Sequence, residues 1–135
     1  MAKRFTREEI KQRFQASIDA GQPIVIASAG IGIAAKFAER GGADMIGLFN
    51  SSYLGLGRVE ATSLMPYGNA NDIVMSLGDR IFPVVQNTPI LGGIIGSDPT
   101  REMTPFLKIM QFKGFPAVIN FPSPGFAYGQ HRRNL

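Results

Sequence analysis

Apolar residues along this chain follow two alternating patterns, helical spacing and short continuous runs. The first helical stretch, at about 6–20, starts at Thr6 with a capping-type sequence and carries Ile10, Phe14 and Ile18 at intervals of four. Continuous apolar runs then follow at about 23–28, 45–49, 89–95 and 117–121. Runs of this kind are typical of strands buried on both faces of a parallel sheet. The pattern therefore predicts a leading helix and four strands.

Three more helical stretches separate these runs. They are predicted at about 33–40, at about 69–82 and between Pro99 and Gly114. Strands that alternate with helices must pair in parallel through right-handed crossovers, so the fold class is α/β. Four strands are half of the eight that a closed parallel barrel needs. The two outer strands would then be open edges, which predicts either a homo-oligomer or a missing C-terminal half.

Composition places the chain in one domain, predicted as a single partial barrel over residues 1–135. The chain has 135 residues, of which 44% are hydrophobic, and no cysteine, which excludes disulfides, thiolate metal sites and cysteine nucleophiles. No apolar run is long enough to cross a membrane, and no secretion signal follows Met1. We therefore expect a cytoplasmic protein without membrane contact.

The net charge of +4 is concentrated at the two ends of the chain. Basic residues cluster near the start and again at Arg132 and Arg133, without interleaved aromatic residues. Solvated basic ends explain this distribution, and we expect no nucleic-acid partner. A small anionic ligand suits the charge equally well.

Small and polar residues follow each predicted strand, where helix N-termini offer N–H groups to anions. The long, glycine-rich segment 50–68 is predicted to be a loop on this ligand side. The candidate site residues are Ser28, Gly30, Gly32, Asn50, Ser51, Tyr67, Asp98 and Asn120.

Several of these candidates have two interpretations. Gly30 and Gly32 fit a relaxed dinucleotide pattern, but Asn50 stands where a ribose-binding acid would be needed, so a tight turn is favoured. Asp98 suits a metal ligand, general base or hydrogen-bond acceptor, and it equally suits a turn or N-cap before a helix. Tyr67 could offer a phenol to the pocket or pack beneath the loop.

Other polar residues are expected to be structural. Asp44 precedes a strand and so lies on the opposite face from the candidate site, and Glu60 is expected to be a solvated loop carboxylate. His131 is the sole histidine, so one chain cannot build a catalytic triad or a two-histidine metal site.

The sequence also resembles the phosphoenolpyruvate hydrolase-like family over nearly its whole length. Short segments in a specific order carry the resemblance: Gly21-Gln22-Pro23-Ile24, Ala29-Gly30-Ile31-Gly32, Gly41-Gly42-Ala43-Asp44, Tyr67-Gly68-Asn69-Ala70-Asn71, Gly96-Ser97-Asp98-Pro99 and Asn120-Phe121-Pro122. The resemblance implies the N-terminal half of a TIM (β/α)₈ barrel related to the phosphoenolpyruvate mutase and isocitrate lyase superfamily. It implies a phosphonate, phosphoenolpyruvate-like or keto acid substrate, and magnesium as the superfamily's cofactor, although no metal site is assigned.

Two functions follow from the resemblance and the polar strand ends. The first is a lyase or hydrolase in which Gly30 and Gly32 admit the anionic group, neutral side chains hydrogen-bond it, and Asp98 is the acid/base or metal ligand. The neutral side chains are those of Ser28, Asn50 and Asn120. The second is a non-catalytic ligand-binding or regulatory half-barrel that works as an oligomer. The absent second half favours the regulatory reading, and the polar strand ends favour the enzyme.

Overall fold

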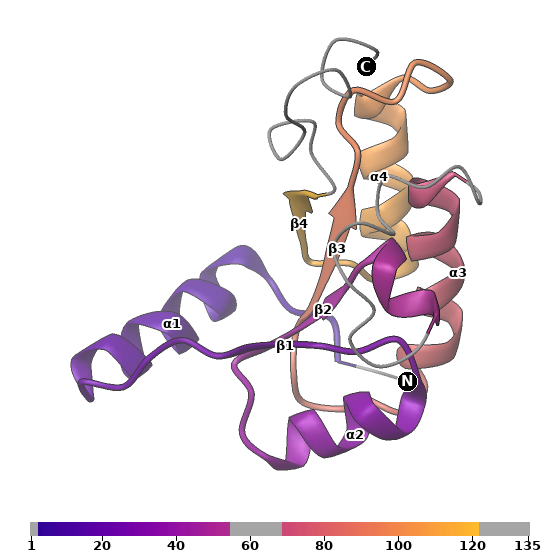
Figure 1. Cartoon of the computed structure of the whole chain (residues 1–135). Coiled ribbons are helices and arrows are strands. Elements are labelled where there is room, and N and C mark those ends of the chain that lie inside the picture. The colour runs from indigo at the N-terminus through magenta and orange to yellow at the C-terminus, as the bar shows by residue number, and fades with distance from the viewer. Residues whose placement is uncertain (1–2, 55–68, 122–135) are drawn as a thin grey trace, which may run out of the picture.

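The computed structural model describes residues 3–54 and 69–121. The helices are α1 (Arg7–Asp19), α2 (Gly32–Arg40), the short 3-10 helix η1 (Asn50–Leu54), α3 (Ala70–Ile81) and α4 (Met103–Lys113). The strands are β1 (Ile26–Ser28), β2 (Met45–Leu48), β3 (Ile90–Ile94) and β4 (Ala117–Asn120). After α1, strands and helices alternate along the chain (Figure 1).

The four strands form one parallel sheet in the order β1-β2-β3-β4. Ile26 pairs with Met45, Ile46 with Ile90, and Leu91 with Ala117. Each strand therefore lies beside the next one in the sequence, with a helix in every connection. This is the arrangement of half a (β/α)₈ barrel, and it confirms the predicted fold class.

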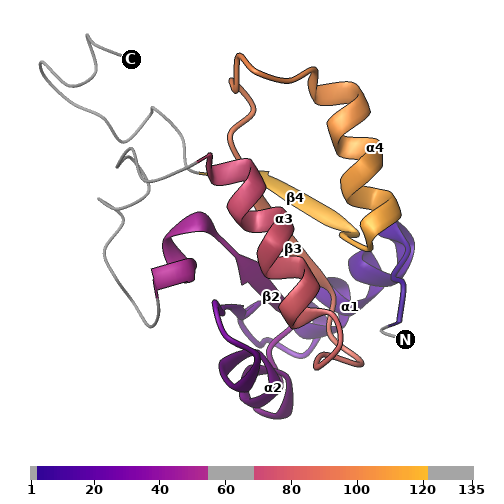
Figure 2. The same ribbon diagram turned by 90° about the vertical axis from the view of Figure 1, so that its right-hand side faces the viewer.

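Different helices pack on the two faces of the sheet. Helices α2, α3 and α4 lie on one side, and α1 lies on the other (Figure 1). Figure 2 looks onto the side covered by helices, where α3 lies over β2 and β3 with α4 alongside. Alternate strand residues point to each side: Ile46 and Ile90 join the large core with the helices, whereas Met45 and Leu91 pack with Ile10 of α1.

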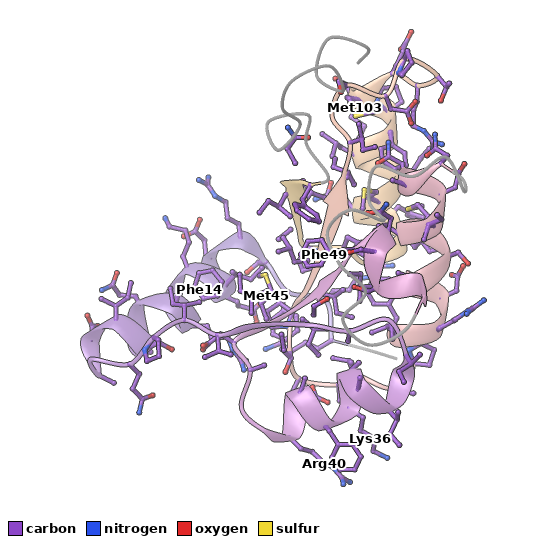
Figure 3. The ribbon with its side chains drawn as sticks, viewed as in Figure 1. Phe14, Lys36, Arg40, Met45, Phe49 and Met103 are labelled. Carbon is purple, nitrogen blue, oxygen red and sulfur yellow. The ribbon has the colours of Figure 1, made fainter. Side chains whose placement is uncertain are left out.

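Helix α1 is fixed at the end of the sheet where the strands begin. Phe14 of α1 lies next to Met45 of β2 (Figure 3). The Arg13 guanidinium donates to the carbonyl oxygens of Asn87 at 3.1 Å and Ala43 at 3.2 Å, in the segments that precede β3 and β2. Because α1 covers only this end of its side of the sheet, other residues must cover the same side near the carboxyl ends of the strands.

The edge strands differ from the prediction. The prediction that each strand is buried on both faces is correct for β2 and β3, which are buried throughout. It is wrong for β1 and β4. Among the described residues each outer strand has a neighbour on one side only, so Ile26 of β1 is 47% exposed and Ile119 of β4 is 45% exposed. β1 also starts at Ile26 and not at 23, because the Asp44 carboxylate accepts the Val25 N–H at 2.9 Å.

Parts of the predicted ligand-side loop lie outside the described residues. The segment 50–68 begins with η1, and the prediction for Tyr67 and Glu60 falls on residues outside the described ranges, as does that for His131. No helix within the described ranges is long and apolar enough to span a bilayer.

Candidate functional site

The turns that follow β1 and β2 are in direct contact. The hydroxyl oxygens of Ser28 and Ser52 are 2.8 Å apart, and either one can donate to the other. Gly30 lies so close to η1 that an added Cβ would overlap the carbonyl oxygen of Ser52. Only glycine fits there, so Gly30 serves the close approach of two backbones.

An aromatic ring covers the interior face beside this hydroxyl pair. Phe49 follows β2 directly, and its ring packs against Gly93 of β3 and Gly47 of β2. A Cβ added at Gly47 would be 2.7 Å from the ring. The Phe121 ring meets Phe49 edge to face, with centroids 5.0 Å apart and an interplanar angle of 74°. Phe49 lies between β2 and β3 in Figure 3. The candidate site therefore has an apolar floor, which the sequence did not predict.

Asp98 is the centre of a hydrogen-bond network after β3. Its Oδ1 accepts from the backbone N–H of Thr100 at 2.9 Å and from the Thr100 hydroxyl at 2.6 Å. Its Oδ2 accepts from the amide of Asn69 at 3.0 Å, from that of Asn71 at 2.9 Å and from Arg101 Nε at 2.6 Å. Five donors thus surround a carboxylate whose side chain is 5% exposed.

This environment sets the protonation of Asp98. Burial alone would raise the pKa of the carboxyl, but hydrogen bonds from Thr100, Asn69 and Asn71 outweigh it and hold the pKa well below its ordinary value. The group is therefore an ionised acceptor at neutral pH and a poor proton carrier. Of the roles that its position suits, hydrogen-bond acceptor is the one seen here.

The Asp98 carboxylate is not free to bind a magnesium ion in this structure. A cation needs the carboxylate lone pairs, and those of Asp98 face five N–H and O–H donors. No cluster of three or more His, Cys, Asp or Glu that could hold a metal occurs within residues 3–54 and 69–121.

Two asparagines tie this network to α3 and β3. Asn69 is the N-cap of α3, and its Oδ1 accepts from the backbone N–H groups of Asn71 and Asp72. Asn71 is fully buried and binds the backbone of Ile95 just beyond β3. Neither was predicted as a site residue, although the Asn-Ala-Asn sequence at a helix start was a usable signal.

The remaining candidates lie around this edge of the sheet without forming one cluster. Asn120 is exposed at the end of β4, and its Oδ1 accepts from Gly96 N at 3.0 Å. Asn50 is 2% exposed at the start of η1, next to the half-buried Ser51. Gly32 is the first residue of α2, and a Cβ there would meet the Val84 side chain at 3.4 Å, an ordinary contact.

The site residues thus form two hydrogen-bonded groups, and Asn120 links the ends of two strands. The first group joins Ser28 and Gly30 to Ser52, and the second joins Asp98 to the two asparagines. Asn120 bridges the ends of β3 and β4. Asp44, by contrast, accepts from Ser17 Oγ and Val25 N at the opposite end of the sheet, the structural position that the sequence predicted.

Comparison with known proteins agrees with this geometry. The model of the family described as phosphoenolpyruvate hydrolase-like matches residues 9–135. The chain belongs to this phosphoenolpyruvate hydrolase-like family. Family membership accounts for the parallel β/α units.

Three longer proteins are similar to this chain. The chain is 42% identical over 130 residues to the "ToMV resistance protein Tm-1(GCR237)" and 42% identical over 127 residues to the "ToMV susceptible protein tm-1(GCR26)", both of Solanum lycopersicum. It is 33% identical over 134 residues to the "Putative transcriptional regulatory protein y4pA" of Sinorhizobium fredii (strain NBRC 101917 / NGR234). These matches cover 96%, 93% and 96% of the chain.

The relatives are much longer than this chain. The matched region spans 17% of each tomato protein and 22% of the bacterial one. The family unit is therefore one part of each relative.

Proposed function

We propose that the site at the strand carboxyl ends binds a small phosphonate, phosphoenolpyruvate-like or keto acid, and that the barrel acts on it as a lyase or hydrolase. The observation that carries this proposal is the Ser28–Ser52 hydroxyl pair beside the Gly30 turn. Membership of the phosphoenolpyruvate hydrolase-like family supports the same substrate class.

The hydroxyl pair is suited to anion binding because of its proton count. Two hydroxyl groups carry two protons, and one of them is used in the bond between Ser28 and Ser52. The other remains available to a ligand oxygen. The Asn120 side chain contributes in the same way, since its Oδ1 is bound to Gly96 N and its NH₂ group is left to donate. The apolar floor at Phe49 would lower the local dielectric and strengthen these bonds.

Asp98 is proposed as a positioning residue of this site. Its five hydrogen bonds and lowered pKa support a role in holding the start of α3 and the turn after β3. Its alternative role as the acid/base or metal ligand stays a prediction.

A regulatory barrel that binds a ligand without turning it over is the second candidate. The lowered pKa of Asp98 favours it, because an ionised acceptor with five hydrogen bonds is a poor proton carrier. Two relatives, named as a ToMV resistance protein and a putative transcriptional regulatory protein, favour the same proposal.

We also propose that a further half-barrel covers the open edges. Ile26 of β1 and the preceding Ile24 and Val25 are exposed, as are Val118 and Ile119 of β4, all between 38% and 49%. Paired parallel strands would bury these side chains and their free backbone groups. The partner would be a second copy of the chain or the remainder of a longer protein, and it would complete the ligand site.

A turnover assay separates the two functions. Hydrolysis of phosphonopyruvate breaks the carbon–phosphorus bond, with the water oxygen adding to phosphorus and a proton ending on the carbon of pyruvate. ³¹P NMR of the protein with phosphonopyruvate or phosphoenolpyruvate would show phosphate accumulating if the enzyme proposal holds. Saturable binding without phosphate release supports the regulatory barrel. Absence of both binding and turnover contradicts both candidates.

A further inference from the structure

A pocket lies at the far end of α4 from Asp98, where the strands begin. It has a volume of about 400 Å³ and is formed between the start of α1 with the residues before it and the end of α4 with the residues that lead to β4. Its lining includes Arg4, Phe5, Arg7, Gln111, Phe115 and Pro116. Its volume lies within the usual range for small-molecule sites. The strand-end proposal does not involve this pocket.

The charge around this pocket is positive. No acidic side chain is among the described residues that line it. The nearby Glu9 carboxylate is already bound, since it accepts from the Thr6 backbone N–H at 2.7 Å and pairs with Lys3 Nζ at 3.0 Å. Two guanidinium groups therefore share the pocket without a matching carboxylate.

The two arginines differ in their contacts. Arg4 donates to the carbonyl oxygen of Phe112 at 3.1 Å, and its guanidinium carbon lies 5.9 Å from the centre of the Phe112 ring. Arg4 is thus anchored at the last turn of α4 with donors to spare. Arg7 makes no side-chain ion pair or hydrogen bond within the described part of the chain. It is the group with its full donor set available to a ligand.

The apolar part of the lining limits the ligand further. Phe115 is 3% exposed and Phe5 packs with the small core beneath α1, so both rings are held in place. Of the two rings, Phe5 is only half-buried, and a bare inorganic ion would leave its exposed part in contact with water. We infer that this pocket binds a small organic anion, a phosphate or carboxylate carried on an apolar body, at a site separate from the strand carboxyl ends.

An NMR titration of the ¹⁵N-labelled chain with phenyl phosphate tests this inference. We expect saturable shifts of the Arg7, Gly114 and Phe115 amides, weaker binding of inorganic phosphate, and none of benzyl alcohol. Arg7→Gln should weaken phenyl phosphate binding about tenfold, and added salt should weaken it too. The matched control is Lys11→Gln on the same helix, because Lys11 pairs with Glu8 at 3.6 Å and does not line the pocket.

A second variant tests the site from the opposite wall. Gln111→Glu adds a carboxylate to the lining and should abolish phenyl phosphate binding with the amide spectrum otherwise unchanged. Binding that is equal in the native chain and in both pocket variants would overturn the inference. Shifts confined to Ser28, Gly30 and Ser52 would also overturn it, since the anion would then occupy the strand-end site alone.

Discussion

The Asn71 side chain makes two hydrogen bonds to the backbone of Ile95. Its Oδ1 accepts from Ile95 N at 2.8 Å, and its Nδ2 donates to the Ile95 carbonyl oxygen at 3.2 Å. The same Nδ2 reaches Asp98 at 2.9 Å, and the Asn71 side chain is fully buried. The first turn of α3 therefore fixes where β3 ends and how the turn carrying Asp98 begins.

Asn71→Ala should lower the free energy of unfolding by about 3 kcal/mol, because the part-buried backbone of Ile95 would lose both hydrogen-bond partners and a fully buried side chain would be removed. Urea denaturation followed by circular dichroism measures this. Asp72→Ala is the control on the same helix turn: Asp72 is 68% exposed and pairs with Arg101 at 3.0 Å, so the cost should stay under about 1 kcal/mol. Equal losses in the two variants would contradict the assigned role of Asn71.

Asp98→Asn should make stability less dependent on pH in the acid range. The folded-state pKa of Asp98 lies below its unfolded value, so its contribution is fully present above the unfolded pKa of about 4 and is lost as pH falls toward the folded pKa. The variant should be less stable than the native chain by about 3 kcal/mol at neutral pH. Urea midpoints at a series of pH values should show this gap narrowing below about pH 4. A gap that is constant between neutral pH and pH 2 contradicts the account.

Gly30→Ala should prevent the turn after β1 from packing on η1, since the added Cβ overlaps the Ser52 carbonyl oxygen. We expect a loss of at least about 2 kcal/mol in unfolding free energy or no folded protein. Gly32→Ala is the matched control two residues away, where the Cβ meets Val84 at 3.4 Å and should change stability by less than about 1 kcal/mol. Thermal melts of both variants check the difference, and an intact Gly30→Ala protein would contradict the packing described.

Ile119→Lys should abolish any association through the β4 edge. Ile119 is 45% exposed on the outer strand, and a charge there would be buried by strand pairing. Light scattering should show the native chain larger than a monomer and the variant monomeric. Ile18→Lys on α1 is the control, as Ile18 is 55% exposed but belongs to neither edge strand, and it should leave the mass unchanged. A monomeric native chain would rule out a second copy as the partner.

The hydrophobic pattern was sufficient to predict the fold because strand burial and helix spacing are local properties. The runs at 45–49 and 89–95 are central strands, so their burial matches their composition. The same pattern misjudged the exposure of the edge strands, because apolar runs do not reveal which neighbour is absent. An edge strand that becomes paired on assembly has the same apolar composition as a central strand.

The candidate site was predicted by position and only partly by residue. Strand ends identified Ser28, Gly30 and Asp98, because parallel strands bring their following turns to one edge. The sequence missed Ser52 as the partner of Ser28, and it missed Asn71, because these contacts join segments 24 and 27 residues apart. Hydrogen bonds across such distances depend on register, which a single sequence does not specify.

Calorimetric titration of phosphonopyruvate into the native chain and into Ser28→Ala tests the central claim most directly. If the hydroxyl pair binds the ligand, the native chain should bind it saturably and the variant about tenfold more weakly, since one neutral hydrogen bond is lost with its neighbour's alignment. Ser17→Ala, which removes a hydroxyl at the opposite end of the sheet, should bind as the native chain does. Equal affinity in all three proteins would contradict the assignment of the ligand site to the strand carboxyl ends.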